Sequence, residues 1–244
     1  TPMKIICALI SCLLAATAAR ADTVTVAVGL ALPPYVLADD DRGAELDVVR
    51  EALAVKGHEL KPVYVPFREV VPMVVGGKVD ASMTLNEDSG AASLFYSDVH
   101  MIYQNVAVGL SEREINVESI ADLGRYWVLG FQDAAKYLGD EFALMSRNNP
   151  RYGETSRQKS QVSMLFKERV DLVVSDKNIF NWYRRQQERV NVKRPVTQFA
   201  LFPPTYYKVA FNHENLRDDF NAGLAELKKT GRYDQILEYY FRES

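Results

Sequence analysis

Polar side chains that could bind a small molecule stand at the ends of two apolar segments. Asp176 comes directly after the apolar run Val170–Val174, which has the composition of a buried strand. Its carboxylate could bind a cationic group, or it could cap the helix expected just after it. Ser82, Thr84 and Asn86 alternate along another expected strand and its exit, so they share one face. Both sets predict hydrogen-bonding groups at strand ends.

The sequence lacks the patterns that carry metal, nucleophilic or nucleotide chemistry. The histidines have no metal-ligand spacing: His58, His100 and His213. A Gly-x-Ser-x-Gly elbow, a P-loop and a dinucleotide fingerprint are absent from the sequence. Four side chains could act as general acids: Glu87, Asp88, Asp176 and His100. Because no basic anchor for an acidic substrate is evident, the sequence predicts no catalytic residue, no metal site and no cofactor.

The composition is that of a globular protein that does not bind nucleic acid. The chain has 244 residues, of which 48% are hydrophobic and 25% are charged, and both fractions are ordinary for folded domains. Its 29 basic and 32 acidic residues give a net charge of −3, whereas DNA- and RNA-binding proteins carry a basic patch or stripe. The length allows one large domain or two small ones.

The first 21 residues have the features of a secretory signal peptide. Lys4 supplies a positive charge, Ile5–Ala19 is almost wholly apolar, and Ala19-Arg20-Ala21 fits a signal peptidase site. The apolar run is shorter than the roughly 20 residues of a membrane span. The residues before Cys12 resemble a lipoprotein acylation site only faintly, because the apolar run continues past that cysteine. We therefore expect cleavage after residue 21 and a periplasmic location.

Removal of the signal peptide changes the chemistry of the mature chain. It takes away Lys4 and Arg20, so that 27 basic residues (29 − 2) against 32 acidic residues leave a charge of −5. It also takes away Cys7 and Cys12, the two cysteines of the sequence, and with them any disulfide or thiol. The stability of the mature chain must then come from a hydrophobic core, which the remaining 223 residues (244 − 21) can supply.

Strand and helix patterns alternate along the mature chain. Valines alternate with small or polar residues over 22–29, as in a strand, and residues 44–56 have apolar side chains at helical spacing. Further strands are expected at 61–65, 79–85, 105–110, 127–131, 170–174 and 207–211. Two helices are expected after residue 215. This alternation predicts βαβ units, and two such sets of roughly 90 to 100 residues predict two lobes.

Seven short segments stand in a recognisable order: Val26–Gly29 with Pro34-Tyr35, Gly43–Val48, Gly77–Ala81, Tyr96–Asp98, Ile120–Gly124, Arg169–Asp176 and Leu224–Tyr239. Together they resemble the periplasmic solute-binding proteins of the polar amino-acid transport type, bacterial extracellular solute-binding protein family 3. The resemblance covers nearly all of residues 22–244. It implies an α/β, two-lobed periplasmic-binding-protein-like (type II) fold in which the chain crosses between the lobes twice.

The resemblance also implies how the lobes and the partners are organised. Lobe 1 would comprise residues 22–109 and 207–244, and lobe 2 residues 110–206. A small polar solute, an amino acid or a related compound, would bind between them and stabilise the closed form, which an inner-membrane ABC permease would recognise. A monomer is expected. Two alternatives remain open: a sensor or adaptor that presents the solute to a membrane receptor, and a periplasmic dehydratase-like enzyme acting on cyclic acids.

Several site residues follow from the same resemblance. Tyr35 matches the aromatic residue that packs on the ligand, and Asp176 matches the aspartate that binds an ammonium group. Thr84 and Asn86 lie where family members hydrogen-bond the ligand from lobe 1. A closed site of this kind would pair the carboxylate with a cationic group of the solute.

The arginine that grips an α-carboxylate in lobe 1 of the family is missing here. The segment between Leu85 and Tyr96 contains no basic residue, and the match places Ser89 or Gly90 where the arginine would stand. A hydroxyl cannot replace a guanidinium fork against a carboxylate. We therefore expect a ligand that is not an ordinary α-amino acid, or one that is held differently.

The lobe 2 loop that would hold an anion also differs from the family pattern. Family members carry Gly-Thr or Gly-Ser before a helix, where this chain has Phe131–Lys136. Asp133 and Ala134 then lie at the helix start, and the Asp133 side chain is expected to cap the amides that would otherwise hold a carboxylate. Lys136 could supply a replacement charge. His100 is expected as a polar residue at the rim of the site.

Overall fold

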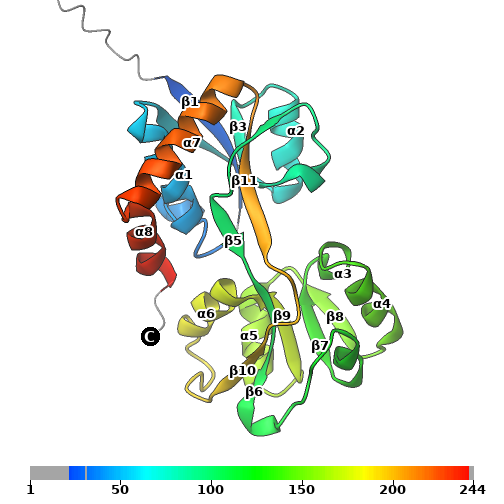
Figure 1. The fold of residues 1–244 in the computed structure, drawn as a ribbon. Coiled ribbons are helices and arrows are strands. Elements are labelled where there is room, and N and C mark those ends of the chain that lie inside the picture. The colour runs from blue at the N-terminus through cyan, green and yellow to red at the C-terminus, as the bar shows by residue number, and fades with distance from the viewer. Residues whose placement is uncertain (1–21, 31, 242–244) are drawn as a thin grey trace, which may run out of the picture.

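Two α/β lobes, one above the other in Figure 1, are joined by two long strand segments. The computed structural model describes residues 22–30 and 32–241. The predicted signal peptide, residues 1–21, and the question of acylation at Cys12 therefore lie outside the described residues. Each lobe is built on its own sheet, and the sheets are used below to define lobe 1 and lobe 2.

Lobe 1 contains a six-stranded sheet with the order β2-β1-β3-β11-β4, and β5 pairs with β11. The strands are β1 (Thr23–Gly29), β2 (Glu59–Val65), β3 (Ala81–Leu85), β4 (Phe95–Tyr96), β5 (Met101–Tyr103) and β11 (Thr205–Phe211). The helices are α1 (Ala44–Val55), α2 (Val70–Val75), α7 (Glu214–Lys229) and α8 (Arg232–Phe241). The strands β1, β2 and β3 run parallel, as the predicted βαβ pattern requires, and β11 is antiparallel to β3.

Lobe 2 contains a five-stranded sheet with the order β10-β6-β9-β7-β8. The strands are β6 (Asn105–Leu110), β7 (Val128–Phe131), β8 (Tyr152–Thr155), β9 (Leu172–Asp176) and β10 (Val196–Phe199). The helices are α3 (Ala134–Tyr137), α4 (Asp140–Asn148), α5 (Gln158–Phe166) and α6 (Lys177–Arg185). Here β7 pairs in parallel with both β8 and β9, which places their carboxyl ends at one edge.

The chain changes sheet at Gln104 on its way from lobe 1 to lobe 2. β5 pairs with β11, whereas β6 pairs with β9 and β10. Residues 105–109 therefore pair in the second sheet, although the predicted boundary placed them in lobe 1, and β11 begins at Thr205 rather than after 206. Because β5 and β6 are almost continuous, the apolar pattern of the sequence does not mark the residue at which the pairing partner changes.

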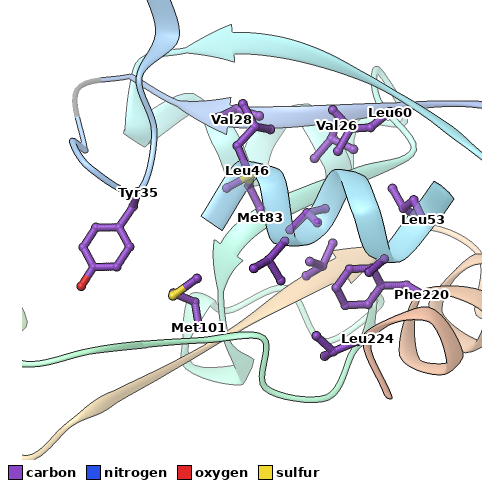
Figure 2. Packing of buried hydrophobic residues seen from close by; sticks show 14 of the residues in the cluster. Val26, Val28, Tyr35, Leu46, Leu53, Leu60, Met83, Met101, Phe220 and Leu224 are labelled. Atoms are coloured by element: carbon purple, nitrogen blue, oxygen red, sulfur yellow. The ribbon is translucent and has the colours of Figure 1, made fainter. Parts of the chain in front are cut away.

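Apolar side chains cover both faces of both sheets. In lobe 1 one cluster lies under α1 and α7 and another under α2, and lobe 2 likewise has two clusters. Figure 2 shows the first lobe 1 cluster; members from β1, α1 and α7 are Val26, Val28, Leu46, Leu53, Phe220 and Leu224. Tyr35 lies at the edge of this cluster, and its hydroxyl points away from the other labelled side chains.

Candidate functional site

The predicted site residues of the two lobes meet through one direct contact. The Tyr35 hydroxyl, in the loop after β1, donates to Asp176 Oδ1 at the end of β9 over 3.1 Å. The Asn178 side-chain amide donates to the same hydroxyl over 2.9 Å. The carboxyl ends of β1 and β9 therefore face each other across the two lobes. In open α/β sheets such edges are the usual place of a ligand site.

The backbone around helix α1 positions Tyr35. The amides of Glu45 and Leu46, in the first turn of α1, donate to the Tyr35 carbonyl over 3.1 and 3.4 Å. The approach is close enough to require glycine at position 43, where φ is +140° and a Cβ atom would lie 2.3 Å from that carbonyl oxygen. The Tyr35 ring stacks on Tyr103, with 3.7 Å between the ring centroids. Tyr35 is consequently fully buried.

Asp176 accepts four hydrogen bonds. As the N-cap of α6 its Oδ1 accepts from the amides of Asn178 and Ile179 over 2.9 and 3.1 Å, and from the Tyr35 hydroxyl. Its Oδ2 accepts from the Gln104 amide, at the crossing between the lobes, over 2.8 Å. Of the two interpretations that the sequence left open, the capping role is observed, and contact with a solute stays a prediction.

Burial raises the pKa of Asp176, although the four donors oppose the shift. A carboxyl whose pKa is higher in the folded chain than the usual value of about 3.9 contributes most stability below that value, and the contribution is lost as the pH rises through the folded pKa. Lowering the pH from 7 to about 3.5 should therefore stabilise the wild-type chain relative to an Asp176→Asn variant. Urea-unfolding midpoints of both proteins at both pH values test this. A constant or opposite difference would contradict it.

A buried carboxylate that the sequence reasoning missed, Glu45, organises the lobe 1 side. Its Oε1 accepts from the Thr84 hydroxyl over 2.9 Å and lies 2.8 Å from His100 Nε2, and its Oε2 accepts from the Tyr103 hydroxyl over 2.8 Å. Glu45 and His100 are both fully buried, so the expectation of His100 at a polar rim is wrong. The available signal was that Glu45 lies four residues before Val49, on the apolar face of its helix.

Thr84 adopts an unusual backbone conformation at the end of β3. Its φ is +62°, which is uncommon for a β-branched residue and carries strain. The register between β3 and β11 shifts at this point, between Lys208 and Ala210. The hydroxyl of Thr84 donates to Glu45 within the buried cluster, and contact of Thr84 with a solute stays a prediction.

The other predicted lobe 1 residues lie in the short turn after β3. The amide of Asn86 donates to the Ser89 hydroxyl over 3.1 Å, which closes the 3₁₀ turn Glu87–Ser89. Lys208 lies 2.5 Å from Glu87 Oε1, and this ion pair lowers the pKa of Glu87. A basic residue thus approaches the segment from β11, yet a carboxylate of the chain already pairs with it.

The lobe 2 loop contains a second carboxylate that the sequence reasoning missed. The amides of Asp133 and Ala135 donate to Glu154 Oε2 and Oε1 over 2.8 and 2.9 Å, and the Tyr152 hydroxyl donates to Oε1 over 2.6 Å. The expectation that the Asp133 side chain caps α3 is wrong: its φ is +63° and its side chain makes no cap hydrogen bond. Ala134 is buried at the helix start.

Glu154 therefore accepts hydrogen bonds from the amides that, by the family resemblance, were expected near a solute carboxylate. It reaches α3 because β8, which carries it, runs parallel to β7 with Glu154 opposite Gly130. The spacing of 21 residues between Glu154 and Asp133 contains no local signal of this contact. At this edge the amides of Asp133 and Ala135 are thus paired with a carboxylate of the chain itself.

Metal binding and membrane crossing find no support in the described residues. Within residues 22–30 and 32–241 no group of three or more histidine, cysteine, aspartate or glutamate side chains could hold a metal ion. Over the same ranges, none of the helices combines the length and apolar character needed to cross a bilayer.

Comparisons with solved structures identify the same fold in three proteins of different roles. The ligand-binding core of GluR0 in complex with L-glutamate has a TM-score of 0.72 and 17% identity, with 91% of this chain and 100% of that chain covered. A histidine kinase sensor domain with similarity to periplasmic binding proteins has a TM-score of 0.69 and 19% identity, and the match covers 91% of this chain and 96% of that chain. An ancestral arginine-binding protein bound to arginine has a TM-score of 0.68 and 21% identity, and the match covers 90% of this chain and 98% of that chain.

The match to a protein family covers almost all of the described residues. A comparison with curated protein sequences gives no significant match. The family model of the bacterial extracellular solute-binding proteins, family 3, matches residues 24–243, which include both sheets and the contact between Tyr35 and Asp176. The chain therefore belongs to the bacterial extracellular solute-binding proteins of family 3.

Proposed function

We propose that the protein binds a small polar solute between its two lobes and releases it chemically unchanged. The observation that carries this proposal is the contact of Tyr35 with Asp176, because it brings together the carboxyl ends of β1 and β9. A solute that touches both lobes stabilises the arrangement in which they are close. The family to which the chain belongs supports solute binding as the role.

The proposed contacts come from both lobes. The Tyr35 ring would pack on the solute, and Asp176 would accept a hydrogen bond from an amino or hydroxyl group that replaces the Tyr35 hydroxyl. The end of β3 would add the polar group of Thr84, and the turn after it those of Asn86 and Ser89. On lobe 2, Asp133 and Ala134 would face the solute from the start of α3. Since Glu154 occupies two amides there, a solute carboxylate is disfavoured at that point.

The proposed setting is the periplasm, with an inner-membrane ABC permease as the partner that receives the solute from a monomeric binding protein. The likeness to a histidine kinase sensor domain supports a second candidate, in which the loaded protein is presented to a membrane receptor. Deletion of the protein separates the two: uptake of the labelled solute is lost in the first case, and only a transcriptional response to it in the second.

A thermal-shift screen of amino acids, amines, organic acids and cyclic acids tests solute binding directly. A true ligand at 100 times its Kd should stabilise the fold by about 2.7 kcal/mol.

Replacement of Asp176 or Tyr35 by alanine should then weaken binding ten-fold or more, because a hydrogen bond to a charged group contributes about 1.5–3 kcal/mol. Tyr35→Phe keeps the stacked ring and isolates the hydroxyl.

The matched control is Tyr239→Ala, since Tyr239 is an exposed tyrosine of lobe 1 outside this contact. Its affinity for the solute should equal that of the wild type. Unchanged affinity in both the Asp176 and the Tyr35 variants would place the solute elsewhere. Conversion of a cyclic acid by the purified protein would favour the enzymatic alternative instead.

A further inference from the structure

A pocket of about 450 Å³ opens on lobe 2 beside helices α5 and α6, which contact each other. Two cationic side chains, Arg157 and Lys159, line it together with three serines, two glutamines and Tyr183. No acidic residue is among its lining. The pocket is therefore locally positive, although the chain as a whole has a net charge of −3.

The two cations of this pocket have no carboxylate partner in the part of the chain that the structure describes, unlike several arginines of the same lobe. Arg113 pairs with Glu168 and Asp171, and Arg194 pairs with Glu168. Within the described ranges 22–30 and 32–241, neither Arg157 nor Lys159 has a carboxylate within ion-pair distance. Their charge is thus available to a ligand, and the shape of a guanidinium suits two-point contact with a carboxylate or phosphate.

The amide side chains of the pocket are held in place by the protein. The Ser175 hydroxyl donates to Gln158 Oε1 over 3.3 Å, which leaves the NH₂ end of Gln158 as the donor for a ligand. Gln187 Nε2 donates to the Lys159 carbonyl over 2.9 Å. These bonds join α5 to the segment just after α6 and to the end of β9, so the polar lining is organised before any ligand arrives.

We infer that this pocket is an anion site that binds the carboxylate or phosphate group of a small molecule. Two unpaired cations, serine hydroxyls and a fixed amide donor supply the complementary charge and hydrogen bonds, and a volume of about 450 Å³ suits a small organic molecule. At the start of α3, Glu154 occupies the amides that could bind an anion. The proposed site at the start of α5 has no such internal carboxylate in its lining.

The pocket adjoins the contact between the lobes. Tyr183, one of its walls, packs both against the core cluster that contains Tyr35 and against the lobe 2 cluster beneath α5. Gln158 is bonded to Ser175, the residue before Asp176. An anion bound here would lie beside the surfaces through which lobe 2 meets lobe 1, yet its binding does not require the proposed solute to be present.

Titration of the full mature chain with sodium phosphate and, separately, with sodium succinate tests the proposal. Calorimetry or thermal shift at ionic strength matched with sodium chloride should show saturable binding of at least one of the two anions. Arg157→Ala and Lys159→Ala should each weaken that binding at least ten-fold. Arg157→Lys, which keeps the charge and loses the fork, should give an intermediate loss.

Lys167→Ala is the matched control, because Lys167 is exposed at the opposite end of the same helix and lies outside the pocket. Its anion affinity should equal that of the wild type. Saturation by phosphate alone would identify a phosphate site, and saturation by succinate would identify a carboxylate site. Absence of saturation by either anion, or equal losses in Lys159→Ala and Lys167→Ala, would overturn the inference. Retention of anion binding in Asp176→Ala would show that it stands apart from the proposed solute site.

Discussion

Replacing Glu45 by alanine is expected to destabilise the fold by about 3–5 kcal/mol, because removal of one partner from a buried polar pair leaves the others without compensation. The Thr84 and Tyr103 hydroxyls and His100 Nε2 would all lose their acceptor in a fully buried environment. Within the described ranges the Nδ1 atom of His100 has no hydrogen-bond partner, so no other protein contact there compensates the ring for the loss of Glu45. Urea unfolding of the wild type and the variant measures the loss.

Glu51→Ala is the matched control for this prediction. Glu51 lies on the same helix and pairs with Arg232 at the surface, over 2.7 Å, and exposed pairs of this kind contribute only about 0–1 kcal/mol. Glu45→Gln, which keeps the size of the side chain and one acceptor oxygen, should lose less than Glu45→Ala. A loss for Glu45→Ala no larger than that for Glu51→Ala would contradict the assignment of Glu45 as the centre of the buried cluster.

Gly223→Ala is expected to destabilise the fold by about 3 kcal/mol or more, at the upper end of overpacking effects. A Cβ atom at this position of α7 would lie 1.9 Å from the carbonyl oxygen of Ala52 in α1 and 2.7 Å from its carbonyl carbon. The obstacle is backbone, so the two helices must separate. Alanine would otherwise favour an interior helix position over glycine by about 1 kcal/mol, which means that packing reverses the expected sign.

Gly124→Ala provides the comparison, because its added Cβ atom would meet only Met145 Cγ at 3.9 Å, an ordinary contact. Its effect on the unfolding midpoint should be small. If Gly223→Ala proved neutral or stabilising, the close approach of α1 and α7 would not exist in solution. Calorimetric unfolding of the two variants beside the wild type distinguishes these results.

Much of the secondary structure could be predicted because local patterns reflect burial directly. Alternating valines marked β1, whose second to seventh residues are mostly buried, and helical spacing marked α1 to within one residue of its end. The short strands β8 and β10 were not predicted. Each has four residues with little burial, so neither carries the continuous apolar run by which a strand is recognised from sequence.

The candidate site was less predictable because its contacts join distant segments. The position of Asp176 after a strand fits a helix cap and a ligand contact equally well, and the structure shows the cap. Nothing in the sequence around Glu154 indicates a hydrogen-bond partner 21 residues away. Parallel pairing of β7 with β8 creates that contact, and such pairing is not visible in a single sequence.

The amino-acid sequence by itself determined the alternation of strands and helices, the family resemblance and the absence of a basic residue between Leu85 and Tyr96, because each depends on residue type and short spacing. Only the tertiary structure decided which charged side chains are paired within the chain and which remain available to a ligand. It buries Glu45 with His100 and places Glu154 on the α3 amides, and among the residues it describes Arg157 and Lys159 have no carboxylate partner. Charge pairing depends on distances of a few ångströms between segments that are far apart in the chain, and folding alone sets those distances.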